Sequence, residues 1–147
     1  ITTALLHGGT SSIIAIGAPP GTTGWSVGIR EPRNENLLID DFRIADHALS
    51  TSAQGKPIVV DGEELGHIID PKTGRPAHSD VLSATVIAPT AALADALSTA
   101  VLVMGVERAK VFCQDHPDAV VLVSGPGGPV WFNRVPNAPD GTGTVSG

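Results

Sequence analysis

Short apolar runs, separated by glycine and proline, occupy the first third of the chain and predict strands. Residues 4–9 and 13–16 are two such runs, and residues 24–29 alternate after an Ala-Pro-Pro-Gly turn. Apolar residues at every second position mark a half-buried strand, and clusters of glycine or proline end it. The pattern therefore predicts a β-meander. Weaker alternation beyond it predicts a polar loop and then two short strands, at residues 32–36, 37–39 and 42–49 respectively.

The pair Asp61-Gly62, in the middle of the chain, predicts a hairpin turn. It separates residues 56–60 from residues 64–69, and both segments contain apolar runs. Asp-Gly is a favoured two-residue hairpin loop because both of its positions need a positive φ. We therefore expect two paired strands here, the second of which ends in a loop at residues 70–74.

From residue 81 onward the pattern changes from strand-like to helical. Residues 81–88 form a run rich in β-branched side chains that ends at a proline, and Thr90 follows as a helix N-cap. Residues 91–104 then predict a helix that Gly105 breaks, and residues 106–115 predict a second, more amphipathic helix.

The chain then returns to strands. Residues 119–123 predict a buried strand, and a turn at 125–129 leads to a final strand at 130–132. Strands, two adjacent helices and strands again indicate an α+β domain whose helices cover one face of a mainly antiparallel sheet. We expect this domain to span residues 1–136. Residues 137–147 are rich in Pro, Gly, Ser and Thr, and we expect them to form a disordered tail.

The charge balance excludes one class of partner. Nine Lys and Arg residues stand against fifteen Asp and Glu residues, which gives a net charge of -6. Such a chain offers no basic surface to attract nucleic acid or anionic lipid, so we expect neither as a partner. To bind a polyanion such as a pyrophosphate, an acidic protein must neutralise it locally, and a metal ion is the usual means.

The cysteine content and the lengths of the apolar runs exclude further kinds of site and segment. The single cysteine, Cys113, excludes an internal disulfide, and no Cys-x-x-Cys or His-rich cluster indicates a zinc site. The apolar runs are shorter than the about 20 residues that a bilayer-spanning helix needs, so we expect no membrane span. Because the chain opens at Ile1 directly in an apolar segment, we expect its natural start, with any signal peptide or lipidation site, to lie upstream.

One charged residue interrupts an otherwise apolar helix. Asp95 lies past the first turn of the helix predicted at 91–104, and the apolar residues on nearly all sides of that helix indicate that it is buried. A buried carboxylate needs a partner. Thr99 lies on the same helical face, and the two oxygens suit Mg²⁺. Spacing leaves two interpretations open: a partial metal site, or a structural pair in which Asp95 bonds a neighbouring loop amide and Thr99 its own helix.

A histidine precedes a tight turn in the middle of the chain. His67 lies near the end of the strand predicted at 64–69, before a turn that Asp70 and Gly74 dictate. Its imidazole can accept a proton, or it can be a partly buried ring bonded to backbone. Asp70 can act as a catalyst or as an Asx-turn residue that shapes the loop. The residues alone favour the structural interpretation for both.

Two motifs in register resemble a known family. The segment HIIDPKTGRP at residues 67–76 is similar to the His-x-Ile-Asp-Pro-x-Thr-Gly-x-Pro signature of FAD:protein FMN transferases, the ApbE-like flavin transferases. The segments SATVIAPT at 83–90 and ADALSTA at 94–100, followed by Gly105, resemble the next block of the same family in the expected order. The resemblance covers nearly the whole chain up to about Val123, and it corresponds to the C-terminal half of such a protein.

The resemblance implies a T-fold-like α+β fold and a role for each site residue. In this family the histidine equivalent to His67 is catalytic and lies at the bound FAD, and the isoleucine equivalent to Ile69 lies against FAD. The residues equivalent to Asp95 and Thr99 bind Mg²⁺. With these roles, the metal-site interpretation of Asp95 and Thr99 and the proton-acceptor interpretation of His67 become the favoured ones.

The implied activity is Mg²⁺-dependent transfer of FMN from FAD to a threonine or serine hydroxyl of an acceptor protein, with release of AMP. FAD is then a substrate and Mg²⁺ the cofactor. The implied acceptor is a flavoprotein subunit of a membrane redox complex, and relatives are commonly extracytoplasmic, membrane-associated lipoproteins. Two alternatives stay open: an FAD pyrophosphatase that gives FMN and AMP, and a non-catalytic flavin-binding module or half-enzyme. Ser11, Ser52 and Ser98 lack the Gly-x-Ser-x-Gly context of a hydrolase nucleophile, so we expect no serine hydrolase.

Overall fold

A six-stranded sheet forms the middle layer of the protein, which we describe from a computed structural model covering residues 1–55 and 58–134. Every neighbouring pair in the sheet is antiparallel. In spatial order the strands are β1 (Ala4–Gly8), β2 (Ser12–Ile16), β5 (Ala48–Ala53), β10 (Ser83–Ala88), β11 (Val120–Gly125) and β12 (Gly128–Phe132). The antiparallel sheet expected from the sequence is confirmed.

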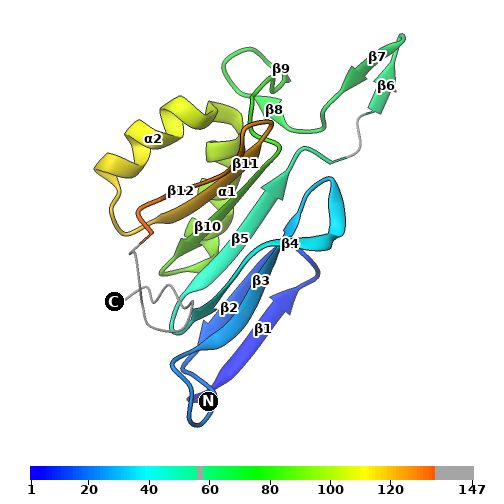
Figure 1. The fold of residues 1–147 in the computed structure, drawn as a ribbon. Helices are drawn as coiled ribbons and strands as arrows, with labels where there is room; N and C mark the ends of the chain where they lie inside the picture. Colours follow the sequence, from blue (N-terminus) through cyan, green and yellow to red (C-terminus); the bar gives the residue numbers. More distant parts are fainter. Residues whose placement is uncertain (56–57, 135–147) are drawn as a thin grey trace.

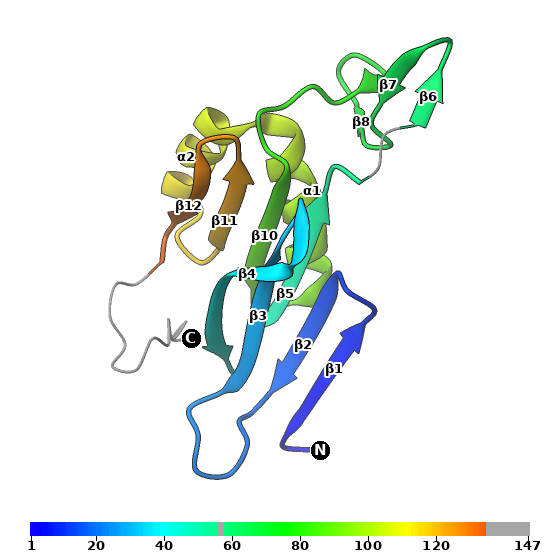
Figure 2. The ribbon, with the colours of Figure 1, turned by 45° about the vertical axis from the view of Figure 1, so that its right-hand side comes forward.

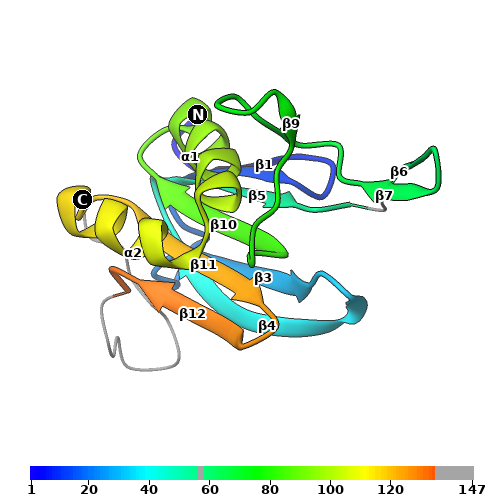
Figure 3. The same cartoon turned by 90° about the horizontal axis from the view of Figure 1, so that it is seen from above.

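Two consecutive helices, α1 (Ala91–Met104) and α2 (Val106–Asp115), cover one face of the sheet (Figure 3). The hydroxyl of Thr90 caps α1 by accepting the backbone N–H of Leu93 over 3.3 Å. Gly105, with a φ of 80°, ends this helix and begins the next. The predicted helices, their cap and their break are therefore confirmed. Among the described residues, no helix has the length and apolarity that crossing a membrane requires.

The other face of the sheet is covered by a hairpin of two longer strands, β3 (Trp25–Glu31) and β4 (Asn34–Ile44). Figure 3 shows this hairpin and the helices on opposite sides of the sheet. Val27, Ile29 and Phe42 of the hairpin pack with Leu49 and Leu122 of the sheet in one core cluster. A second cluster lies between the sheet and the two helices. The molecule thus has three layers, with the sheet buried in the middle.

The sequence pattern was misleading over β4. The loop predicted at 32–36 and the separate strands predicted at 37–39 and 42–49 are wrong, because β4 is one strand of 11 residues. Register shifts beside Ile29 and Arg30 break the period of two that the prediction relied on. Consecutive residues in the first half of β4, 36–38, are exposed, and of its described side chains only Phe42 and Ile44 near its end are buried, so the strand shows no regular alternation.

The connection from β5 to β10 leaves the sheet as an excursion with two small hairpins, which project from one end of the molecule (Figures 1 and 2). The first pairs β6 (Ile58–Val60) with β7 (Glu63–Leu65), and the second pairs β8 (Ile69–Asp70) with β9 (Arg75–Pro76).

The predicted turn in the first hairpin is confirmed, since Asp61 and Gly62 have φ values of 52° and 85°. The strand predicted at 64–69 is wrong, because β7 pairs only with the three residues of β6 and ends at Leu65. His67 consequently lies in the connection to β8 rather than near the end of a strand. Lys56 and Pro57 lie outside the described residues.

The last two strands agree with the sequence pattern. Residues 120–124 of β11 are buried, as predicted for a strand at 119–123, and a tight turn joins them to β12. The tail predicted at 137–147, together with the domain boundary at 136, lies outside the described residues.

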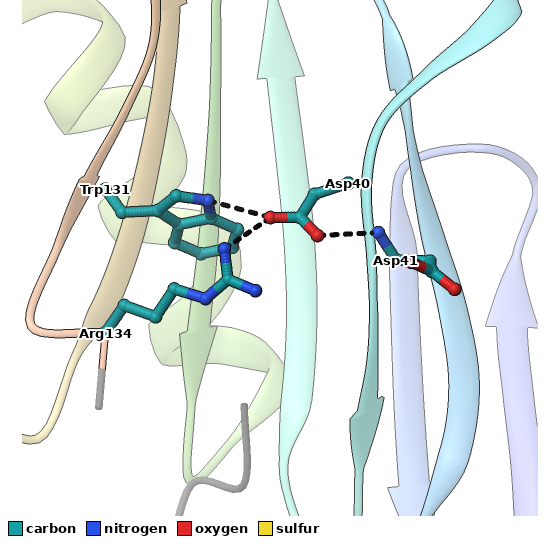
Figure 4. Close-up of polar contacts among 4 residues, drawn as sticks. All are labelled: Asp40, Asp41, Trp131 and Arg134. Atoms are coloured by element: carbon teal, nitrogen blue, oxygen red, sulfur yellow. Dashed lines mark hydrogen bonds and ion pairs between the residues drawn. The ribbon is translucent and has the colours of Figure 1, made fainter. Parts of the chain in front are cut away.

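A polar contact ties the outer hairpin to the edge of the sheet (Figure 4). The indole Nε1 of Trp131, in β12, donates to Oδ2 of Asp40, in β4, over 3.0 Å. The guanidinium of Arg134 donates to the same oxygen and lies 4.7 Å from the centroid of the Trp131 ring. Contacts between Asp40 and two residues more than 90 positions further along the chain thus fix β4 over the β12 side of the sheet.

Candidate functional site

Two serines of β5 face α1 and begin a group of side-chain oxygens. Ser50 and Ser52 are two positions apart in the strand, so their side chains point to the same face of the sheet. The hydroxyl of Ser50 donates to Oδ1 of Asp95 over 3.0 Å. Its oxygen also lies 3.3 Å from Oγ of Ser12, in β2. Ser50 therefore anchors the Asp95 carboxylate to the sheet.

Ser52 forms hydrogen bonds with side chains one turn further along α1. Oγ of Ser52 lies 2.8 Å from Oγ1 of Thr99 and 2.8 Å from Oγ of Ser98. The Ser98 and Thr99 hydroxyls also donate to the backbone carbonyl of Asp95, which joins the two sets of contacts. We call the linked residues the oxygen cluster: Ser12, Ser50, Ser52, Asp95, Ser98 and Thr99. The pair Asp95 and Thr99, predicted from the sequence, thus becomes part of a larger set through contacts with β5.

The expectation that α1 is buried on nearly all sides is wrong. The helix forms an outer layer and buries one face only, through Ala94, Ser98, Val101 and Leu102. Asp95 and Thr99 are exposed. Because water still reaches Asp95, its carboxylate does not carry the desolvation cost that the sequence suggested. The same exposure leaves both side chains open to a ligand.

The structural alternative considered for this pair is found in part. The Thr99 hydroxyl lies 3.4 Å from the backbone carbonyl oxygen of Asp95, within its own helix. The Asp95 carboxylate accepts from the Ser50 hydroxyl instead of a loop amide.

The donor atoms of the oxygen cluster are of the kind that binds Mg²⁺. Every side chain in it offers oxygen, and Mg²⁺ is held in many proteins by one or two carboxylates together with waters and substrate phosphates. Asp95 supplies the only carboxylate of the cluster. Residues 1–55 and 58–134 contain no group of three or more His, Cys, Asp or Glu side chains that could hold a metal. The cluster therefore fits a Mg²⁺ that takes its remaining ligands from a substrate or other donors.

His67 lies beyond the end of β5 at which Ser52 contacts Thr99 of α1. The position a Cβ would take at Gly55 is 3.1 Å from Cε1 of the His67 ring, so the imidazole lies against this glycine. The backbone N–H of Gln54 donates to the carbonyl of Leu82 over 2.9 Å, which continues the pairing of β5 with β10 up to this point. Three residues of extended chain span about 10 Å, and Gly55 follows Ser52 by three positions. His67 and the oxygen cluster therefore share one end of the sheet.

The turn after His67 presents Ile69 and is shaped by Asp70. Oδ1 of Asp70 accepts the backbone N–H of Lys72 over 2.9 Å, and its carbonyl accepts the N–H of Gly74 over 2.8 Å. This confirms Asp70 as an Asx-turn residue. Ile69 lies opposite Pro76 in the small hairpin, and half of its surface is exposed (50%). Its side chain is thus available for apolar contact with a ligand.

The cysteine does not contribute a nucleophile. Cys113 lies on the buried face of α2, and burial raises the pKa of its thiol to about 11. At neutral pH the group is therefore the unreactive thiol.

Sequence reasoning missed the serines of the cluster. The segment ALSTSA of β5 contains three consecutive hydroxyl residues, 50–52, at buried or half-buried positions. Buried hydroxyls need partners, so this run was the available signal. Their partners on α1, more than 40 positions away, could not be identified from spacing.

A cleft of about 630 Å³ lies on the opposite face of β5 and was also not predicted. It is bordered by the β1–β2 turn, by the last residues of β3 and by β5. The lining residues include His7, Gly9, Thr10, residues 28–31, Leu49, Thr51, Ala53 and Ser83.

Comparison with proteins of known sequence gives consistent matches. Residues 1–123 match the sequence profile of the ApbE family. The FAD:protein FMN transferase of Escherichia coli (strain K12) is 40% identical over 102 residues, which make up 68% of this chain and 29% of that protein. The FAD:protein FMN transferase of Treponema pallidum is 37% identical over 101 residues, which make up 67% of this chain and 28% of that protein. The chain thus spans less than a third of the length of these relatives.

Solved structures of ApbE proteins are similar to this chain in fold. The crystal structure of the ApbE protein from Thermotoga maritima is similar over 88% of this chain and 41% of its own, with a TM-score of 0.73 and 36% identity. The flavin transferase ApbE from Vibrio cholerae is similar over 82% of this chain and 39% of its own, with a TM-score of 0.63 and 28% identity. These folds and the match over residues 1–123 lead to one conclusion: the chain belongs to the ApbE family.

Proposed function

We propose that the full-length protein transfers FMN from FAD to a hydroxyl group of an acceptor protein and releases AMP. The observation that carries the proposal is that the oxygen cluster and His67 lie toward the same end of β5, with Gly55 at the His67 ring three positions after Ser52. The names of its relatives, FAD:protein FMN transferases, support the same reaction. The acceptor we propose is a flavoprotein subunit of a membrane redox complex.

Asp95 and Thr99 are the residues we propose to hold Mg²⁺. When bound there, the ion supplies positive charge that offsets the pyrophosphate oxygens of FAD. Ser50 orients the Asp95 carboxylate, and Ser52 orients the Thr99 hydroxyl, through the contacts given above. Two side chains of α1 are thus held in position by a rigid strand rather than by a loop, which suits the precise placement that phosphoryl transfer needs.

His67 is the general base of the proposed reaction. Its imidazole takes the proton from the acceptor hydroxyl while the hydroxyl oxygen attacks the phosphorus of the FMN half of FAD. A new phosphorus–oxygen bond forms, the bridging phosphorus–oxygen bond breaks, and AMP leaves with the electron pair. Ile69, exposed on the turn after His67, contributes apolar contact to the bound FAD.

Water is the competing nucleophile. His67 is exposed, so water has access to the proposed base. Attack by water at the same phosphorus would give FMN and AMP in solution, which is the pyrophosphatase alternative. A non-catalytic flavin-binding module or half-enzyme is the other alternative, since the chain spans less than half of its solved relatives.

The test uses the full-length protein with FAD, Mg²⁺ and a purified flavoprotein subunit of a membrane redox complex from the same organism. We expect a band with flavin fluorescence on a denaturing gel and one AMP released for each FMN attached. FMN and AMP in solution without such a band would establish the pyrophosphatase. Binding of FAD without turnover, whether or not Mg²⁺ is present, would establish the binding module.

A further inference from the structure

The chain leaves the sheet and returns to it at one place, beside Gln54. The excursion that carries His67 starts after β5 and returns into β10, and these two strands are neighbours in the sheet. Their backbone pairing continues to the N–H of Gln54, which donates to the carbonyl of Leu82 over 2.9 Å. We call residues 54–55 the outgoing arm and residues 77–82 the return arm.

The side chain of Gln54 extends this pairing along the return arm. Its Nε2 donates to the carbonyl of Val81 over 2.8 Å and to the carbonyl of Ser79 over 3.3 Å. A carboxamide nitrogen carries two hydrogens and a backbone carbonyl only accepts, so both hydrogens of the amide are engaged. The Gln54 amide therefore ties the outgoing arm to two points of the return arm that lie closer to the excursion than Leu82.

The return arm is held to the body of the protein. Oδ1 of Asp80 accepts the backbone N–H of Val106, the first residue of α2, over 3.1 Å. The N–H of Leu82 donates to the carbonyl of Ser124, in β11, over 2.7 Å. The return arm is thus a fixed support, and Gln54 connects the outgoing arm to it.

His67 is held between the two arms. Its ring lies against Gly55 of the outgoing arm, where an added Cβ would be 3.1 Å from Cε1. The carbonyl of the next residue, Ile68, accepts the N–H of Ala77 in the return arm over 2.8 Å. Ile68 also packs against the core cluster between the sheet and the helices. The separation of the two arms therefore sets where the imidazole lies relative to its backbone support.

We propose that Gln54 is a positioning residue for the reaction and acts through His67. Its amide keeps the two arms at a fixed separation, so that the imidazole stays in place beyond the end of β5. Without the two donors the outgoing arm moves away from the return arm, and the ring loses the surface of Gly55 against which it rests. This proposal rests on the proposed function, because it names a residue that sets the geometry of the proposed base.

The first test removes the donors and keeps the size of the side chain. Gln54→Met has a side chain of similar length without N–H groups. Because displacements near 1 Å can cost about 10²-fold in rate, and the backbone of His67 keeps its support through Ile68, we expect kcat for FMN transfer by the full-length protein to fall about tenfold. Gln114→Met makes the same change at an exposed position of α2 and should leave kcat unchanged. Equal kcat values for Gln54→Met and the wild type would overturn the proposal.

A double-mutant cycle shows whether Gln54 acts through His67. The residual rate of FAD cleavage is compared between His67→Ala and the variant that carries both His67→Ala and Gln54→Met. A residue that acts only by placing the imidazole has no effect once the imidazole is removed, so we expect the two rates to be equal. A further tenfold loss in the double variant would show a general structural role and overturn the proposal.

Hydrogen exchange measures the link between the arms without turnover. In Gln54→Met we expect the amide of residue 54, which donates to Leu82, to exchange about tenfold faster than in the wild type. The amide of Leu82, which donates to Ser124, should keep its wild-type rate because the return arm stays fixed. Unchanged exchange at residue 54, or an equal increase at Leu82, would contradict the clamping role of the Gln54 amide.

The outcomes separate this proposal from the proposed function. A wild-type protein that releases FMN and AMP without labelling an acceptor overturns the proposed function, and the double-mutant cycle, measured on FAD cleavage, then still decides the role of Gln54. Transfer by the wild type that Gln54→Met leaves intact overturns the role of Gln54 alone.

Discussion

At the scale of single residues, the Asp95 carboxylate is oriented by a hydrogen bond rather than by burial. The hydroxyl of Ser50, which is 1% exposed, donates to it from inside the protein, while the carboxylate remains open to solvent. In this position the carboxylate stays hydrated, and the hydrogen bond fixes its orientation. That combination suits a group whose proposed task is to meet a cation brought by a substrate.

Replacing the Asp95 carboxylate should affect metal binding without affecting the stability of the fold. We expect Asp95→Asn to raise the Mg²⁺ concentration needed for half-maximal FAD cleavage by about a hundredfold or more. Residues that only support a metal ligand already change metal affinity by about 10–100-fold. Thermal stability should change little, because exposed substitutions are usually neutral and the amide oxygen still accepts from Ser50. A Mg²⁺ titration of AMP release measures the first effect and a melting curve the second. Asp115→Asn, an exposed carboxylate on α2, is the control, and equal titrations for both variants would contradict the role of Asp95.

The proposed base gives a second residue-scale prediction. His67→Ala should lower FMN transfer by about 10²–10⁴-fold, the usual contribution of general-base catalysis. Equilibrium dialysis should find FAD binding changed far less than transfer. His78→Ala removes another exposed histidine from the same connection and should leave transfer intact. Loss of FAD binding in His67→Ala, with turnover of the bound fraction unchanged, would make His67 a binding residue.

At the scale of elements, β5 organises the site. Its helix-side face carries Ser50 and Ser52, its other face lines the cleft, and its end contacts His67 through Gly55. The excursion after β5 has small hairpins that pair only within themselves in the described chain, so the contact with Gly55 is an anchor for His67.

This anchor can be tested with one methyl group. A Cβ at Gly55 would lie 3.1 Å from the His67 ring, so Gly55→Ala should push the imidazole back by a few tenths of an ångström. Because displacements near 1 Å can cost about 10²-fold in rate, we expect this smaller shift to lower FMN transfer by about fourfold. Gly66→Ala, where an added Cβ meets open space, controls for the change in backbone freedom. Steady-state transfer rates measure both, and equal rates would show that His67 does not depend on this contact.

At the scale of the whole molecule, the three layers must stay in register for the cleft to exist. The hydrophobic cluster between the outer hairpin and the sheet supplies the non-directional part of this attachment. The contact of Asp40 with Trp131 and Arg134 supplies a directional part at the β12 side (Figure 4).

Removing the Asp40 carboxylate should loosen this attachment. Asp40→Ala leaves the partly buried Trp131 Nε1 without its acceptor, so we expect a loss of about 1–3 kcal/mol in unfolding free energy. The midpoint of urea denaturation measures it. Asp41→Ala, which removes the neighbouring exposed carboxylate, should shift the midpoint much less. Equal shifts would indicate a general effect of charge on β4 instead of this contact.

The features that the sequence determined alone are those set by near neighbours in the chain. The Thr90 cap, the Gly105 break and the Asp61-Gly62 turn follow from backbone preferences over a few residues, and the structure has them where they were predicted. The motif at residues 67–76 likewise indicated the family and predicted the Asx turn at Asp70. Where the backbone departs from regular alternation, as along β4, the same local reasoning failed.

Only the tertiary structure decided which surfaces meet. Ser50 and Asp95 are 45 positions apart, and Ser52 and Thr99 are 47 apart, so no periodicity could pair them. The exposure of Asp95 was decided by α1 lying as an outer layer, and the cleft by β3 crossing the far face of the sheet. The physical reason is that such long-range contacts form when whole layers of secondary structure bury their apolar faces against each other. A local sequence pattern shows that an element has an apolar face, but it does not specify which element covers that face.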